Sequence, residues 1–233
     1  KAKMSFLLPA IAKPFACLMF LAMSFGLVGA QNSEDGDWIS LFDGKTLEGW
    51  KANENGETWS VRDGAIVAKG PVSHLFYVGK DSENPKEFGD FELKLEVMTA
   101  AENTNSGVFF RCLWKDSGWL QKTFEAQIQN SGKNKCYTGG LWIHADRAEE
   151  SPVEDDEWFD MHIIARGEKI TVKIDGETTT EYDASEEKRK WAKVKSKGLI
   201  ALQGHGKQHR PCFRNIRIKN MDKQSEANVG KDD

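Results

Sequence analysis

One six-residue stretch of the sequence carries polar side chains that could act together on a ligand. Residues 124–129 alternate apolar and polar positions, and the polar ones are Glu125, Gln127 and Gln129. Such alternation is typical of a strand with one buried face. The apolar set should face the core, so the carboxylate and the two amides should face outward. They would line either a binding groove or a surface in plain solvent.

Arg111 and His205 are two further residues with suitable chemistry. Arg111 alternates with Phe110 and Cys112, so we expect it to project opposite to them. Its planar cation can hold a sugar hydroxyl or an enolate oxygen through paired hydrogen bonds, or it can form a salt bridge with a cross-strand glutamate. His205 follows a strand end between two glycines. An imidazole there titrates near neutral pH beside a ligand, or it is simply exposed.

Aromatic residues offer a second kind of sugar contact. The chain has 8 tryptophans. Exposed indoles stack on the apolar faces of sugar rings, whereas most indoles in a sandwich belong to its core. Trp142, which follows Gly139-Gly140-Leu141, is the tryptophan that we predict as a platform.

Short alternating runs at turn-like spacing must position these residues. Asp63-Gly64 and Asp175-Gly176 predict tight hairpins, and only Ser185–Val194 has a composition that suits a solvated turn or a short helix. The pattern predicts an all-β, two-sheet antiparallel jelly-roll sandwich. The predicted strands are Thr58–Arg62, Ala65–Lys69, Phe91–Met98, Gly107–Trp114, Thr123–Gln129, Gly140–His144, Trp158–Arg166, Lys169–Ile174, Leu199–Gln203 and Phe213–Lys219.

The first thirty residues are typical of a secretory signal peptide. Three lysines precede the apolar stretch Phe15–Val28, and Val28-Gly29-Ala30 suits signal-peptidase cleavage. The stretch is short for a membrane span and no second one follows, so we expect no integral membrane segment after its removal. A retained amino-terminal anchor is the alternative. We expect export to the periplasm or beyond, and the organisation signal peptide 1–30, linker 31–36, one sandwich domain 37–220 and disordered tail 221–233.

Composition argues against several classes of protein and site. Loss of three lysines with the leader takes the net charge from -4 to -7, which disfavours a basic nucleic-acid binder. Cys112, Cys136 and Cys212 would remain, so at most one internal disulfide forms. No CxxC pair suggests zinc, and we predict neither a metal site nor a cofactor. The acidic stretch Val153–Glu157 leaves room for a divalent cation, although such runs are usually just solvated.

Ordered blocks along nearly all of the mature chain point to one family. They are Leu41–Leu47, Gly49-Trp50, Trp59–Val61, Asp63-Gly64, Gly89–Lys94, Asn105–Arg111, Phe124–Ile128, Glu157-Trp158, Leu202–Gly206 and Phe213–Ile216. These blocks resemble the 3-keto-disaccharide hydrolase family, also described as the 3-keto-glucoside 1,2-lyase and 3-keto-2-hydroxyglucal hydratase domain, of concanavalin A-like lectin/glucanase fold. The chain departs from the family pattern at two single positions: Gly204 stands where the family often has an acidic residue, and Phe124 stands where Tyr is usual. The stretches Trp114–Lys122 and Lys133–Tyr137 have no counterpart in that pattern.

The resemblance implies an oligosaccharide or 3-keto-glycoside substrate. A ketone at C3 acidifies the hydrogen at C2, so a base can remove it while donors hold the enolate and the C1 group leaves. Water can then add to the 2-hydroxy-3-keto-glucal, which gives net hydrolysis. The roles it implies are His205 or Glu125 as base and acid, Arg111 as enolate stabiliser, and Gln127, Gln203, Trp142, His74 and Asn105 as sugar contacts.

Two other functions remain as alternatives. A retaining glucanase on the same sandwich needs two carboxylates about 5 Å apart. Glu125, Gln127 and Gln129 supply only one, which disfavours that mechanism. A non-catalytic, lectin-like carbohydrate-binding module is the alternative from a different class, since a fold alone does not fix activity.

Overall fold

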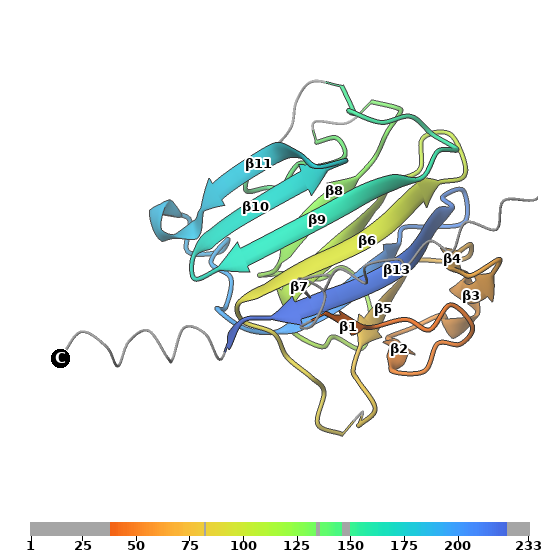
Figure 1. Ribbon diagram of the computed structural model, residues 1–233, viewed down its shortest axis with the longest axis horizontal. Coiled ribbons are helices and arrows are strands. Elements are labelled where there is room, and N and C mark those ends of the chain that lie inside the picture. Colours follow the sequence, from red (N-terminus) through yellow and green to blue (C-terminus); the bar gives the residue numbers. More distant parts are fainter. Residues whose placement is uncertain (1–37, 82, 134–135, 146–149, 223–233) are drawn as a thin grey trace, which may run out of the picture. The chain divides into compact units, whose positions relative to one another are not determined.

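The structure is a computed structural model that describes residues 38–81, 83–133, 136–145 and 150–222 (Figure 1). All of these residues belong to a unit that runs from Asp35 to Asp233. The predicted signal peptide, the linker and most of the predicted tail lie outside the described residues. Within the described ranges, no helix is long and apolar enough to cross a membrane.

Thirteen strands in the described ranges form two antiparallel sheets. The larger sheet has the order β11-β10-β9-β6-β13-β4-β3, with β1 also paired to β13, and the smaller sheet has the order β2-β5-β12-β7-β8. The larger sheet contains β1 (Ile39–Ser40), β3 (Trp59–Arg62), β4 (Ala65–Ala68), β6 (Phe91–Thr99), β9 (Phe159–Arg166), β10 (Lys169–Ile174), β11 (Glu177–Asp183) and β13 (Pro211–Asn220). The smaller sheet contains β2 (Trp50–Ala52), β5 (Ser73–Tyr77), β7 (Ser106–Cys112), β8 (Phe124–Ile128) and β12 (Leu199–Gly204).

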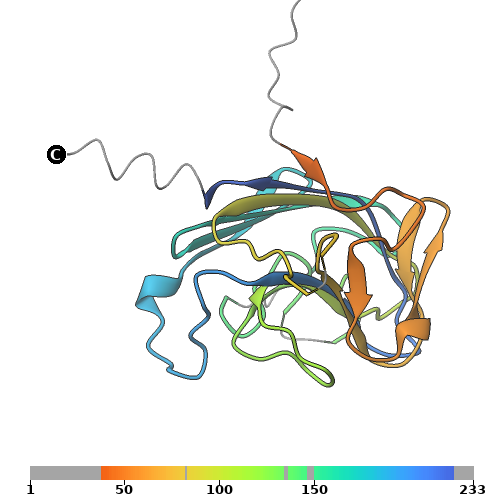
Figure 2. The ribbon, with the colours of Figure 1, turned by 90° about the horizontal axis from the view of Figure 1, so that it is seen from below.

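The hydrophobic core lies between the two sheets. Figure 2 shows the two sheets turned by 90° from the view of Figure 1. Every second residue of β6 from Phe91 to Thr99 is buried, and β8 contributes Phe124, Ala126 and Ile128. Each large apolar side chain buried in this way stabilises the fold by about 1.5–3 kcal/mol. The predicted antiparallel jelly-roll sandwich is confirmed, and the polar set of β8 is left on the outer face of the smaller sheet.

The predicted hairpins form at aspartate–glycine pairs that adopt left-handed backbone conformations. Asp63 and Gly64 have φ values of 50° and 77°, and Asp175 and Gly176 have values of 48° and 86°. Short side chains that tolerate positive φ allow these two-residue turns, whose twist matches the flanking strands. The first pair joins β3 to β4, and the second joins β10 to β11.

Some local predictions differ from the structure. Residues 140–144, predicted as a strand, form only isolated bridges at Leu141 and then a tight turn, in which the amides of His144 and Ala145 both donate to the carbonyl of Leu141. Conversely, β5 was not predicted, because four of its five residues are buried and it shows no alternation. Within Ser185–Val194, the described helix is a single 3-10 turn, η2 (Ala184–Glu186).

A bulge in β7 changes the direction of Arg111. Cys112 pairs with Leu199 and Phe109 with Ala201, so three steps along β7 match two along β12. The extra residue breaks the alternation, and Arg111 adopts φ 51°. The prediction that Arg111 projects opposite to both of its neighbours was wrong. Cys112 instead joins Phe109 in a separate hydrophobic cluster of the smaller sheet.

The chain end and the cysteines add two details. Met221 and Asp222 lie beyond the predicted domain boundary, yet the Met221 amide donates to the carbonyl of Asp90 at 2.8 Å. Cys112 and Cys212 are buried thiols that form no disulfide in the described part of the chain. Burial raises the pKa of Cys212 to about 11 and raises the pKa of Cys112 further.

Candidate functional site

A row of polar residues crosses the outer face of the smaller sheet. His74 of β5 pairs with Gln203 of β12, and Gly107 of β7 pairs with Gln127 of β8. The register of β12 with β7 places Gln203 across from Gly107. Neighbours across a sheet share a face, so these four positions form one row. Their numbers nevertheless run from 74 to 203.

A second row lies two residues along each strand on the same face, and it is apolar except at its end on β8. Phe76 pairs with Ala201, Ala201 with Phe109, and Phe109 with Glu125. Glu125 therefore lies on the outer β8 strand beside an apolar surface. It is only 8% exposed, which is unusual for a carboxylate without a paired cation.

Gly107 leaves the space that the Glu125 carboxyl group occupies. A Cβ atom at position 107 would overlap Oε1 of Glu125 and lie 2.7 Å from its Cγ. Across this gap, Nε2 of Gln203 donates to Oε1 of Glu125 at 3.3 Å. The missing side chain thus lets a carboxyl group from one strand meet an amide from a strand two places away.

Burial controls the charge of Glu125. It raises the pKa of Glu125 to about 8, and the hydrogen bond from Gln203 opposes this rise only in part. The carboxyl group is therefore mainly protonated at neutral pH. A protonated carboxyl group in a cleft can donate a proton to a ligand.

The segment after β8 folds back alongside that strand and brings Trp142 to the site. The amide of Gln127 donates to the carbonyl of Gly140 at 2.9 Å, and the amide of Trp142 donates to the carbonyl of Glu125 at 2.9 Å. The following residue, Ile143, has φ 60°, which is rare for a β-branched residue. These contacts fix Trp142 next to Glu125.

The polar row, the turn at Trp142 and the loop before β8 enclose a cavity of about 270 Å³. Six of the eight predicted site residues line it, and two, Arg111 and His74, do not. The six are Asn105, Glu125, Gln127, Trp142, Gln203 and His205.

His205 enters the cavity directly after β12. Its Nδ1 atom is buried and has no hydrogen-bond partner among the described residues. Its ring packs against Trp119 and His209, with centroids 4.8 and 4.9 Å away. Burial and then the neighbouring His209 lower the pKa of His205 below its usual value. The imidazole is therefore mainly neutral at pH 7, and one nitrogen can accept a proton.

Gly204 stands where the resembled family often has an acidic residue, and the structure shows where a side chain at this position would point. A Cβ atom at this position would lie 3.0 Å from Cγ2 of Thr58 and 3.3 Å from Cβ of Ala68. A side chain here would therefore point away from the outer face that carries the cavity. A carboxylate at position 204 would meet Thr58 before it could orient His205.

Asn105 links the cavity to His209, which sequence reasoning overlooked. The amide of Asn105 donates to Nδ1 of His209 at 3.0 Å, and Nε2 of Gln127 donates to Oδ1 of Asn105 at 3.0 Å. His209 stands four residues after His205, a spacing that could have drawn attention to it. These hydrogen bonds connect His209 to Gln127 through Asn105.

His74 lies beneath the cavity wall. Its ring makes edge contacts with Phe109 and Trp119, at centroid distances of 5.2 and 6.0 Å. Both ring nitrogens are buried without a hydrogen-bond partner in the part of the chain that the structure describes. Burial, then the charges of His205 and Lys115, lower the pKa of His74 to about 4. Its contact with substrate stays a prediction.

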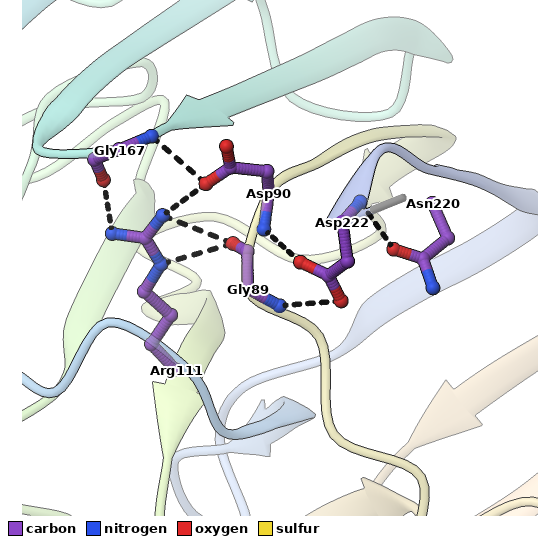
Figure 3. Close-up of polar contacts among 6 residues, drawn as sticks. All are labelled: Gly89, Asp90, Arg111, Gly167, Asn220 and Asp222. Atoms are coloured by element: carbon purple, nitrogen blue, oxygen red, sulfur yellow. Dashed lines mark hydrogen bonds and ion pairs between the residues drawn. The ribbon is translucent and has the colours of Figure 1, made fainter. Parts of the chain in front are cut away.

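Arg111 is held at a different place, where its guanidinium connects β7 to the Gly89-Asp90 segment and to Gly167 (Figure 3). Nε and Nη2 donate to the carbonyl of Gly89 at 3.1 and 2.9 Å, and Nη1 donates to the carbonyl of Gly167 at 2.7 Å. Nη2 also lies 3.4 Å from Oδ1 of Asp90. Asp222 accepts hydrogen bonds from the amides of Gly89 and Asp90.

This cluster, Gly89, Asp90, Arg111, Gly167 and Asp222, is called the Arg111 clasp below. Because its guanidinium is 3% exposed and bonded to protein on three of its nitrogens, it does not reach the cavity. The predicted role of Arg111 as an enolate stabiliser has no support in the geometry. The bulge in β7 is the physical reason for the difference.

The acidic stretch considered for a cation is engaged in hydrogen bonds. Thr99 donates its hydroxyl to Oδ1 of Asp155 at 2.5 Å, and Ser131 donates to Oδ2. Across the described ranges, no group of three or more His, Cys, Asp or Glu side chains is placed to hold a metal ion.

Several cavity residues carried no signal that sequence reasoning could use. Phe109 belongs to an apolar strand, and the segment Trp119–Thr123 has no periodicity. Lys122 also lines the cavity. The loop with Trp119–Thr123 lies over the smaller sheet near Phe109, and only this tertiary arrangement identifies them as cavity residues.

Comparison with known proteins agrees with the observed fold. A solved Parabacteroides distasonis protein, provisionally assigned as a glycosyl hydrolase, is 31% identical, with a TM-score of 0.63 over 78% of this chain and 98% of that one. A second such protein from the same organism is 18% identical, with a TM-score of 0.67 over 84% and 99%. Carbohydrate-binding module CBM66 from Bacillus subtilis is 13% identical, with a TM-score of 0.54 over 76% and 98%, and shares the fold.

One curated relative matches only in part. Human FYVE, RhoGEF and PH domain-containing protein 3 is 29% identical over 103 residues, which cover 44% of this chain and 14% of that protein. The family match is far more extensive, since residues 37–219 match the family described as the 3-keto-alpha-glucoside-1,2-lyase-like domain. With this match over almost the whole described sandwich, the chain belongs to the 3-keto-alpha-glucoside-1,2-lyase-like domain family.

Proposed function

We propose that this protein is an exported enzyme that cleaves 3-keto-glycosides by abstraction of the C2 proton and elimination of the C1 substituent, with hydration of the product where net hydrolysis results. Membership of the family and similarity to glycosyl hydrolases support a carbohydrate-active role. The observation that carries the specific proposal is the meeting of Glu125, His205 and two glutamines at one cavity.

His205 is the proposed base. The hydrogen at C2 of a 3-keto-glycoside is acidic enough for a modest base, and a neutral imidazole is one. The lowered pKa of His205 keeps it neutral, and its buried Nδ1 has no partner among the described residues. A nitrogen lone pair that no protein donor occupies is available to a substrate proton.

Glu125 is the proposed acid. Its pKa of about 8 keeps the carboxyl group protonated at neutral pH, so it can protonate the departing C1 oxygen. Two groups whose surroundings shift their pKa values in opposite directions are a common basis for acid and base roles. The same shift makes Glu125 a poor nucleophile, which again disfavours the retaining glucanase mechanism.

The enolate needs a donor other than Arg111. Gln127, Gln203 and Lys122 line the same cavity and carry N–H groups. Donors fixed in a site from which water is largely excluded stabilise developing negative charge better than solvent does. Trp142 and Asn105 would contact the sugar itself.

Turnover of a defined ketone tests the proposal. Purified protein is incubated with methyl 3-keto-α-glucoside and, separately, with the unoxidised methyl glucoside. We expect loss of the ketone substrate only, abolished by His205→Ala or Glu125→Gln but kept by Glu181→Gln, a matched change on the exposed β11 surface.

The same experiment addresses the second candidate function. Binding of unoxidised glycan without turnover of either compound would favour a non-catalytic module, a candidate that the fold shared with CBM66 supports. Export is tested separately, by locating the mature protein in cell fractions of a host that expresses the chain.

A further inference from the structure

The cavity is small and partly open to solvent. Its volume of about 270 Å³ lies below the range of about 300–1,000 Å³ that is usual for pockets enclosing drug-sized ligands. It suits one sugar ring held among Glu125, Gln127 and Gln203. The open side leaves space for a second ring at the mouth of the cavity.

An exposed indole stands at that mouth. Trp119 lines the cavity and is 46% exposed, more than any other large apolar side chain of the described residues except Trp191. Trp114, a second tryptophan near this loop, contacts other side chains of the protein. Its ring centroid lies 4.8 Å from that of Phe76 and 4.9 Å from Nζ of Lys51. Trp119 packs on His205 and His74 but keeps an exposed surface that a ligand can reach.

The loop that carries Trp119 is anchored at several points. The amide of Gly118 donates to Oε1 of Glu54 at 2.6 Å, and Nδ2 of Asn53 donates to the carbonyl of Lys115 at 3.1 Å. Nζ of Lys115 donates to the carbonyl of Trp119 at 2.7 Å. A platform held in place before binding loses less conformational entropy when a ligand stacks on it.

We propose that Trp119 is the stacking platform for the second sugar ring of a disaccharide substrate, the ring that leaves from C1. This inference rests on the proposed function and deepens it. The indole contacts His205 on one side, so a ring on its exposed surface lies adjacent to the group that would act on C2. The loop sequence then determines which leaving sugar is accepted.

Paired substrates test the platform. The ratio of kcat/KM for a 3-keto-disaccharide to that for methyl 3-keto-α-glucoside is measured for the wild type, Trp119→Ala, Trp119→Phe and Trp191→Ala. Trp191 is the matched control, because it is 59% exposed and lies in the segment after η2, where it contacts Arg189. We expect the ratio to fall about tenfold in Trp119→Ala, to recover in part in Trp119→Phe and to stay at the wild-type value in Trp191→Ala.

Equal losses on both substrates in Trp119→Ala would overturn the proposal, because they would mean that the indole only supports His205. Binding of the unoxidised disaccharide and of methyl glucoside, measured by calorimetry, separates this inference from the proposed function. If no ketone is turned over but Trp119→Ala selectively weakens disaccharide binding, the platform stands and the enzyme proposal fails. If the wild type binds the disaccharide no better than the methyl glucoside, the platform fails.

Discussion

The Arg111 clasp and the cavity at Glu125 each bury a charged or chargeable group, but they satisfy it differently. Arg111 donates to two carbonyl oxygens and lies beside one carboxylate, all supplied by neighbouring segments. At the cavity, Oε1 of Gln203 and Nδ1 of His205 are buried without a partner among the described residues, and the Glu125 pKa is raised to about 8.

This difference separates a structural role from a functional one. A buried polar group with its hydrogen bonds completed costs little and fixes the fold, whereas an unsatisfied one costs about 1–3 kcal/mol. Such a cost is expected where a ligand supplies the missing partner. We therefore interpret the clasp as a structural element and the cavity as the site of chemistry.

The largest effect should come from Glu125→Gln. The amide keeps the shape of the side chain but cannot donate an acidic proton, so kcat/KM on methyl 3-keto-α-glucoside should fall by about 10²–10⁴. The melting temperature at neutral pH should not fall. A fall in melting temperature with activity kept would reverse the roles of the two regions.

Arg111→Met should produce the opposite signature. It leaves the carbonyls of Gly89 and Gly167 and the carboxylate of Asp90 without their partner, at a cost of about 3–5 kcal/mol. We expect the melting temperature to fall by about 10 °C, while the protein that remains folded keeps its kcat. Arg166→Met, which removes an exposed ion pair with Glu92, should cost at most about 1 kcal/mol. A specific loss of kcat in Arg111→Met would mean that Arg111 does reach the substrate.

Gly107→Ala tests how the cavity is constructed. The added methyl group occupies the space of the Glu125 carboxyl group, so kcat/KM should fall about tenfold with little change in KM. Gly56→Ala is the control, because no atom lies within 4 Å of a Cβ atom at that position. Equal kinetics for the two variants would show that Glu125 does not need the gap.

The smallest effect concerns stability at high pH. Because the pKa of Glu125 is raised from 4.5 to about 8 in the fold, its stabilising contribution is complete below about pH 4.5 and is lost as pH rises through 8. Gln cannot ionise, so Glu125→Gln should have a melting temperature a few degrees above that of the wild type at pH 9. At pH 5 the two should differ little. A difference that does not depend on pH would contradict the buried, protonated state.

Local patterns predicted much of this architecture. The alternation in β6 and β8 gave the buried faces, aspartate–glycine pairs gave two hairpins, and the outward face of β8 led to Glu125 and Gln127. Each of these depends on residues close in sequence, where side-chain period and turn geometry decide the outcome.

The errors arose where distant segments decide the outcome. One extra residue in β7 redirected Arg111, and only the pairing with β12 reveals it. The contribution of Trp119 depends on a loop that is anchored to Asn53 and Glu54. No alternation marks such a loop, so its position over the sheet could not be predicted from periodicity.

The fate of the C2 hydrogen shows whether cleavage proceeds by proton abstraction and elimination. Methyl 3-keto-α-glucoside carrying deuterium at C2 is incubated in ordinary water with the wild type, with Glu125→Gln and with buffer alone, and the sugar product is examined by mass spectrometry. We expect the wild type to release product without the deuterium and to cleave this substrate more slowly than the protiated one. Cleavage at an unchanged rate, with deuterium retained in the sugar product, would contradict that mechanism.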